Sequence, residues 1–256
     1  GKFDLSQAEA AADLIRPRLE RGGRLVYIGA GTSGRLAVQD AAELKPTFGF
    51  TRTLVLMAGG EAAGSQALEG AEDDSGAAAR EVAEAGIGPD DAVIGIAASG
   101  RTPYTVAGLR VARERGAATV GIANNPGTLL LEAAEVPVLI QTGAEVLAGS
   151  TRLAAGTAQK IVLNSLSTTV LVQLGGAYSN LMVGMQPTNA KLRERAVVIV
   201  AHAGDATAEQ AAAVLEQAGW DMRTAIVMLR AGVSRAEAEA ALGAAGNRVR
   251  QALEAL

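Results

Sequence analysis

Short apolar runs alternate with longer helical patterns along most of this 256-residue chain, and this alternation limits the folds that it can adopt. The runs have the length of strands: Arg24–Gly29, Thr53–Met57, Ala92–Ala97, Ala118–Ile122 and Val136–Ile140. The helical stretches are Leu5–Arg21, Leu36–Leu44, Ser75–Ala85, Pro103–Arg115 and Gly156–Leu174, the second of them ended by Lys45-Pro46. The alternation predicts an α/β fold, in which helices cover both faces of a mostly parallel five-stranded sheet. In such sheets, ligands bind beyond the carboxyl ends of the strands.

From about Gln186 onward the pattern contains helices only. The three stretches with helical character are Thr207–Ala218, Asp221–Ala231 and Ser234–Leu242. Thr207 and Ser234 are predicted N-caps, because their hydroxyl oxygens can accept from a first-turn N–H. We therefore expect an α/β domain over residues 1–190 and a small helical domain over residues 191–256. No low-complexity linker separates them, so we expect the two to pack together.

The composition excludes several classes of function. The chain has no Cys and a single His, His202, which excludes disulfides, a Cys nucleophile and a metal site built from several histidines. Lys and Arg total 23 against 27 Asp and Glu, so bulk charge attracts neither nucleic acid nor an anionic membrane. No apolar run approaches the roughly 18–20 residues of a membrane span, and no secretory leader is recognisable. Because the chain opens at Gly1 inside a helical pattern, we expect that residues precede it.

The first glycine-rich segment, Gly29–Arg35, follows the first predicted strand and reads G-x-G-x-x-G. This pattern is typical of dinucleotide sites, but such a site also needs an acidic residue at the end of the second strand, where Met57 is followed by Ala58-Gly59-Gly60. The hydroxyls of Thr32 and Ser33 instead favour an anion cradle at a helix N-terminus. The structural alternative is a tight, hydroxyl-capped turn.

Similar segments recur at other predicted strand ends. Ser99-Gly100-Arg101 repeats the tripeptide Ser33-Gly34-Arg35, and Gly149–Arg152 precedes the long helix. Such clusters converge at one edge of a parallel sheet, and they favour a phosphorylated small molecule over structural capping. The predicted ligand-binding residues are Gly31, Thr32, Ser33, Ser99, Gly100, Arg101, Thr102, Ser150 and Thr151.

These segments resemble the sugar isomerase (SIS) domain, a phosphosugar-binding fold. A longer series of motifs, spread over nearly the whole chain, resembles the N-acetylmuramic acid 6-phosphate etherase family. The motifs are Tyr27–Arg35, Asp40–Glu43, Pro46–Gly49, Gly70–Asp73, Gly95–Tyr104, Asn125–Gly127, Gly149–Arg152, Ala155–Lys160 and Pro187–Asn189. The tail, with Gly219–Leu229, resembles that family's small helical domain of ubiquitin-associated type.

The resemblance implies a lyase of amino sugar catabolism. Such enzymes cleave the lactyl ether of N-acetylmuramic acid 6-phosphate to N-acetylglucosamine 6-phosphate and D-lactate, in the cytoplasm, during peptidoglycan recycling. It further implies a homodimer with no metal and no cofactor. The family's two catalytic glutamates fall on Glu43 and Glu72. Ala42 and Leu44-Lys45 depart from the family's usual residues around the first glutamate, although both carboxylates are present.

Carboxylates also fit the chemistry independently of the resemblance. The ether lies β to the aldehyde of the opened sugar, so loss of the C2 proton permits elimination of lactate, and water then adds back. This route needs a base at C2 and an acid at the leaving oxygen. Glu43, near a predicted helix end and near Asp40, is a candidate acid, and Glu72, just before a helix, is a candidate base. The bland alternative is that Glu43 is a solvated helix end and Glu72 belongs to an acidic cap.

Two other functions remain open from the sequence. A non-catalytic phosphosugar-sensing regulator uses the same fold, and retention of both glutamates argues against it. An aldose–ketose phosphosugar isomerase also abstracts the C2 proton but releases no lactate. His202 is interpreted as a packing residue, Lys160 and Lys191 as residues that can neutralise substrate charge, and Trp220 as an anchor of the helical core.

Overall fold

The computed structural model describes residues 2–66 and 70–256. These residues form two compact units, which are described separately. The first contains the residues up to Ala42 together with Arg52–Val170, and the second contains Glu43–Thr51 together with Leu171–Leu256. The sequence predicts a boundary between two domains at residue 190. The two units are defined by how the chain packs, which does not test a domain boundary, so this boundary stays a prediction.

A six-stranded sheet forms the centre of the first unit, in the order β1-β6-β5-β4-β2-β3. Its strands are β1 (Lys2–Phe3), β2 (Leu25–Gly29), β3 (Thr53–Met57), β4 (Ala92–Ile96), β5 (Ala118–Ala123) and β6 (Val136–Gln141). The five strands from β2 to β6 are parallel, which confirms the predicted five-stranded parallel sheet. The edge strand β1 pairs antiparallel with β6, and it could not be predicted because two residues carry no periodicity.

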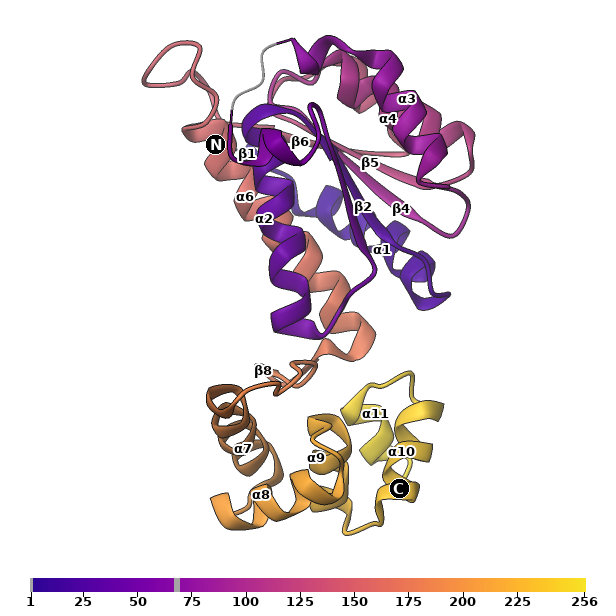
Figure 1. Ribbon diagram of the computed structural model, residues 1–256, viewed down its shortest axis with the longest axis vertical. Helices are drawn as coiled ribbons and strands as arrows, with labels where there is room; N and C mark the ends of the chain where they lie inside the picture. Colours follow the sequence, from indigo (N-terminus) through magenta and orange to yellow (C-terminus); the bar gives the residue numbers. More distant parts are fainter. Residues whose placement is uncertain (1, 67–69) are drawn as a thin grey trace. The chain divides into compact units, whose positions relative to one another are not determined.

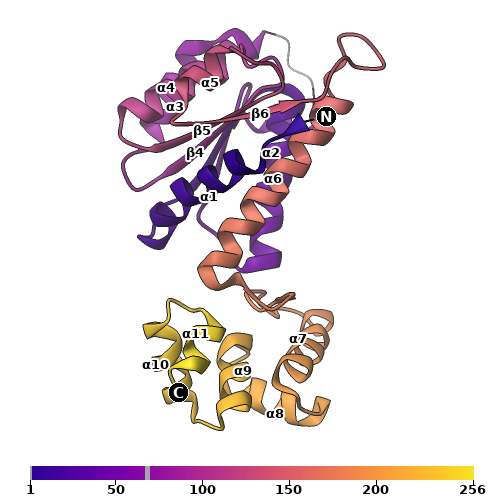
Figure 2. The same ribbon diagram turned by 180° about the vertical axis from the view of Figure 1, so that it is seen from behind.

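Helices cover both faces of this sheet (Figures 1 and 2). They are α1 (Leu5–Glu20), α2 (Gly31–Phe48), α3 (Ser75–Glu84), α4 (Pro103–Glu114), α5 (Leu129–Ala133) and α6 (Ala154–Leu171). Alternate side chains of β2 serve opposite faces: Val26 and Ile28 join the core under α3 and α4, whereas Tyr27 reaches Asp40 of α2. Every residue of β2, β4 and β5 is buried, which explains why these strands are almost wholly apolar rather than alternating.

Helix α2 differs from its prediction at both ends. It starts at Gly31 rather than Leu36, so most of the glycine-rich segment is already helical, and it continues past Pro46 to Phe48. A proline inside a helix removes one backbone hydrogen bond and costs about 3 kcal/mol. Burial of Leu44 helps to offset this cost, and the N–H groups of Gly49 and Phe50 close the final turn on carbonyls of α2.

The second unit is helical apart from a short hairpin. Its elements are η3 (Val172–Gly176), β7 (Ala177–Tyr178), β8 (Leu181–Met182), α7 (Ala190–Gly204), α8 (Ala208–Gln217), α9 (Met222–Ala231), α10 (Arg235–Ala244) and α11 (Val249–Glu254). Thr207 and Ser234 form capping boxes at α8 and α10, as predicted. Trp220 packs against the core of this unit, also as predicted, and Arg193 lies over its ring. The interpretation of His202 as a packing residue is wrong, because its side chain is exposed on α7.

Candidate active site

The first two glycine-rich segments lie side by side at the carboxyl edge of the sheet. Strands β2 and β4 are neighbours in register, with Gly29 opposite Ile96. The segment Gly31–Ser33 continues from one strand and the segment Ser99–Thr102 from the other. The expected juxtaposition therefore follows directly from the strand order.

The first segment is a close strand-to-helix junction. A Cβ added at Gly34 would lie 3.1 Å from Cγ of Met57 and 3.2 Å from the Gly29 carbonyl carbon, so a larger residue would crowd the close approach of the helix to the strands. This packing accounts for the third glycine of the G-x-G-x-x-G pattern without any ligand. Thr32 is half-buried, Gly31 is exposed and Ser33 is buried.

The second segment is a tight turn held by its own backbone and side chains. Ser99 Oγ accepts from the Arg101 N–H at 3.2 Å, and Gly100 has a φ of 65°. A Cβ at Gly100 would lie 2.2 Å from Thr128 Oγ1, so glycine is required here for two reasons. Thr102 is the N-cap residue of α4, and its side chain makes no capping bond within the described structure. Pro103 has no N–H, so Tyr104 and Thr105 supply the first N–H groups of α4, and the Thr102 side chain does not cap them.

The third segment, before α6, adjoins the first. A Cβ added at Gly156 would lie 3.2 Å from the Thr151 carbonyl oxygen and 3.3 Å from Thr32 Cγ2. Ser150 is half-buried and Thr151 is exposed. The carboxylate of Glu145 accepts from the N–H groups of Ala154 and Ala155 at 2.8 and 2.9 Å. A protein carboxylate therefore already occupies the N-terminus of α6, which sequence reasoning missed because Glu145 stands nine residues upstream.

The structure gives each candidate catalytic glutamate its own setting. Glu43 is exposed on α2, five residues before the last residue of that helix, and belongs to the second unit. Because the macrodipole acts within the last turn, the helix-end argument for a protonated Glu43 loses its basis. Glu72 is exposed in the 3-10 turn η2 (Ala71–Asp73) of the first unit, and Asp74, not Glu72, caps α3.

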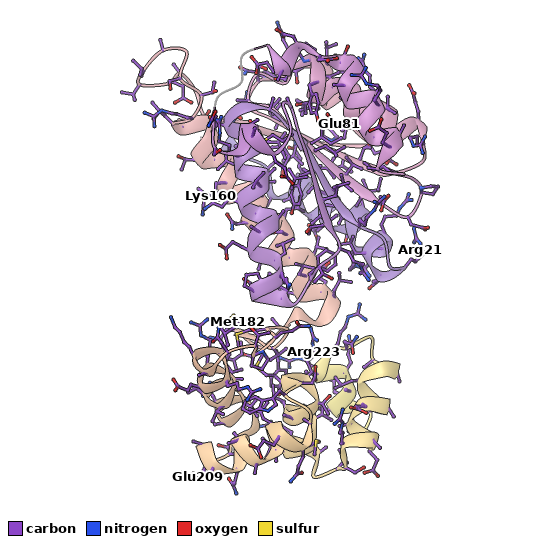
Figure 3. The ribbon with its side chains drawn as sticks, viewed as in Figure 1. Arg21, Glu81, Lys160, Met182, Glu209 and Arg223 are labelled. Carbon is purple, nitrogen blue, oxygen red and sulfur yellow. The ribbon has the colours of Figure 1, made fainter. Side chains whose placement is uncertain are left out.

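Asp40 is buried in a network that joins β2, α2 and α6. Its carboxylate accepts from Tyr27 at 2.7 Å and from Ser167 at 3.1 Å, and its residue is 4% exposed. Burial raises the pKa of Asp40 above its ordinary value, although both hydrogen bonds and the charge of Lys160 act in the other direction. Lys160 itself is exposed on α6, where its side chain is labelled in Figure 3.

Within residues 2–66 and 70–256, no cluster of three or more His, Asp or Glu side chains has a geometry that can hold a metal ion. No helix in these residue ranges is long and apolar enough to cross a membrane.

Two known domain families match parts of this chain. The SIS domain family matches residues 75–169, and the glucokinase regulatory protein N-terminal SIS domain matches residues 7–113. Among solved structures, a phosphoheptose isomerase from Francisella tularensis superposes with a TM-score of 0.51 at 18% identity, covering 66% of this chain and 86% of its own. The fold is therefore that of a SIS-domain protein.

Relatives with higher sequence identity show which family of SIS-domain proteins the chain belongs to. The N-acetylmuramic acid 6-phosphate etherase of Deinococcus radiodurans is 54% identical over 249 residues, which cover 96% of this chain and 82% of the relative. The etherase of Geobacillus thermodenitrificans is 51% identical over 248 residues, covering 96% and 84%. The chain belongs to the N-acetylmuramic acid 6-phosphate etherase family, as its motifs indicated.

Proposed function

We propose that this protein is a lyase that cleaves the lactyl ether of N-acetylmuramic acid 6-phosphate, giving N-acetylglucosamine 6-phosphate and D-lactate. The observation that carries the proposal is sequence identity to two relatives named for this activity. They are 54% and 51% identical to this chain, and each match covers 96% of it. The SIS fold and the adjoining hydroxyl-rich turns support a phosphosugar as the substrate.

The phosphosugar is proposed to bind at the turns that follow β2 and β4, with its phosphate group at the turn after β4. Hydrogen bonds to a charged group are worth about 1.5–3 kcal/mol each, so a few donors suffice for selective binding. The exposed hydroxyl of Ser99 and the N–H groups at the start of α4 are available there. The remaining proposed ligand-binding residues are Gly31, Thr32, Ser33, Gly100, Arg101, Thr102, Ser150 and Thr151.

The proposed chemistry is elimination followed by addition of water. A carboxylate removes the C2 proton of the open-chain sugar, the electron pair forms the C2–C3 double bond, and the C3–O bond breaks. A carboxylic acid protonates the departing lactate oxygen, and water then adds at C3 while C2 regains a proton. Glu72 is proposed as the base and Glu43 as the acid, so the two groups need opposite protonation states.

The remaining proposals, on pathway, compartment, oligomeric state and cofactors, rest on membership of the etherase family. The reaction belongs to amino sugar catabolism and peptidoglycan recycling in the cytoplasm, and the protein acts as a homodimer without a metal or an organic cofactor. Sedimentation at micromolar concentration tests the dimer, because a single species of 25.9 kDa would contradict it.

The activity is tested by incubating the protein with N-acetylmuramic acid 6-phosphate and measuring D-lactate and N-acetylglucosamine 6-phosphate. We expect equal amounts of the two products, and little product from unphosphorylated N-acetylmuramic acid. Binding without any product would favour the phosphosugar sensor. Conversion to a ketose with no lactate would favour the isomerase.

A further inference from the structure

A chain of buried and half-buried hydrogen bonds connects Ser33, in the first turn of α2 after β2, with strand β6. Ser33 Oγ lies 2.9 Å from Gln159 Oε1, and Gln159 Nε2 lies 2.9 Å from Asn124 Oδ1. Asn124 Nδ2 lies 3.0 Å from the carbonyl oxygen of Ile140 on β6. All four residues belong to the first unit, so the chain is internal to one compact body.

The direction of these hydrogen bonds is set at their far end. The Ile140 carbonyl can only accept, so the Asn124 amide must turn its nitrogen toward it and its oxygen toward Gln159. Gln159 must then present its nitrogen to Asn124 and its oxygen to Ser33. The hydroxyl of Ser33 is left with one arrangement, in which it donates its single proton to Gln159.

This direction restricts what Ser33 can do for a ligand. A serine hydroxyl has one proton and two lone pairs. Because its proton is committed, Ser33 has only lone pairs to offer, and those repel a phosphate oxygen but accept from an N–H or O–H group. Gln159 is 0% exposed and Ser33 7% exposed, so water does not compete freely for either group.

We infer that Gln159 is a positioning residue that holds Ser33 as a hydrogen-bond acceptor, and that Ser33 recognises a donor of the sugar, an acetamido N–H or a hydroxyl, rather than the phosphate. The phosphate is left to the donors of the turn after β4. This inference rests on the proposed function, because it assumes that a phosphosugar occupies the site, but it concerns which part of that ligand each turn contacts.

The test compares two ligands and two serines. Ser33→Ala should weaken binding of N-acetylglucosamine 6-phosphate by roughly three- to tenfold, the usual worth of a neutral hydrogen bond, and leave inorganic phosphate binding within about twofold. Ser99→Ala should weaken both ligands. Calorimetry measures these affinities without turnover, so the result is independent of whether lactate is released. Equal weakening of both ligands by Ser33→Ala would overturn the inference.

Gln159 is tested through its coupling to Ser33. Gln159→Leu should raise the KM for the phosphosugar about as much as Ser33→Ala and change kcat less, and the double variant should be no worse than either single variant. Gln159→Glu keeps an acceptor facing Ser33 and should recover part of the loss. Ser165→Ala is the matched control, since that hydroxyl is exposed on α6 and donates to the Ile161 carbonyl of the same helix. If the increases in KM of the two single variants add in the double variant, the positioning role is refuted. It is also refuted if Gln159→Leu leaves KM unchanged while the wild-type protein releases lactate.

Discussion

At the scale of single residues, the proposed chemistry depends on Glu43 and Glu72. Substitution of either by Gln keeps the shape and removes the proton-transfer group, so kcat should fall by about 10²–10⁴-fold while product affinity changes little. Loss of the base should suppress C2 proton exchange, whereas loss of the acid should retain some exchange and block lactate release. Exchange measured by NMR separates the two, and the reverse pattern would swap their roles. Near-normal turnover in both variants would remove the two-carboxylate proposal.

Asp40 gives a second prediction at this scale, through pH. Its raised pKa means that the folded chain holds this proton more tightly than the unfolded chain. The free energy of unfolding therefore falls as pH rises from about 3.9, the ordinary Asp value, through the raised value. Asp40→Asn should reduce this fall in denaturant titrations.

Asp91 is the control of opposite sign. Burial raises its pKa, but the hydrogen bonds from Arg24 and Gly88 outweigh burial and leave the pKa lowered. Its contribution is present above about pH 3.9 and is lost as pH falls through the lowered value, so Asp91→Asn should flatten the acid side instead. The same change of slope in both variants would contradict the assignment for Asp40.

The proposed ligand-binding residues can be picked out from local sequence motifs, whereas the residues that support them cannot. Ser99 and Thr102 follow an apolar strand, which marks them locally. Gln159 lies 126 residues from Ser33 in the sequence, and Asn124 lies 35 residues from Gln159. No spacing rule links partners this far apart. Their meeting depends on the strand order and on the position of α6, which exist only in the folded chain.

At the scale of elements, the turn after β4 depends on a glycine. Gly100→Ala places a methyl group in a left-handed conformation and 2.2 Å from Thr128 Oγ1. Gly127→Ala is the matched control, because its φ of 61° resembles the 65° of Gly100 while no atom of residues 2–66 and 70–256 lies within 4 Å of the added Cβ. Both should lose about 1 kcal/mol through the left-handed strain, and Gly100→Ala should lose more in urea unfolding and also raise KM. Equal losses in the free energy of unfolding would show that the Thr128 side chain moves aside at no cost.

Element boundaries show where local patterns fail. All five parallel strands and the three predicted tail helices were recognisable, because burial on both strand faces and N-capping leave strong local signals. The sequence pattern predicts that helix α2 ends at Lys45-Pro46, but the helix continues to Phe48 because packing of Leu44 outweighs the local preference of proline. Short elements such as α5 and β1 carry too few residues for a period.

At the scale of the whole molecule, the residues between 171 and 190 belong with the helices that follow them. Val183 and Met185 are buried in the same core as α7 to α11. A chain cut after residue 190 should therefore expose this apolar surface, bind a hydrophobic dye and unfold less cooperatively than the full chain. A truncated chain with the sharp unfolding transition of the full chain would instead support the domain boundary predicted at residue 190.

In the proposed reaction, lactate leaves by elimination after loss of the C2 proton. Running the reaction with N-acetylmuramic acid 6-phosphate in D2O and analysing both products tests this step. We expect D-lactate and N-acetylglucosamine 6-phosphate in equal amounts, with one deuterium at C2 of the sugar. Lactate without deuterium at C2 would contradict elimination, and deuterium at C2 without lactate would contradict the etherase itself.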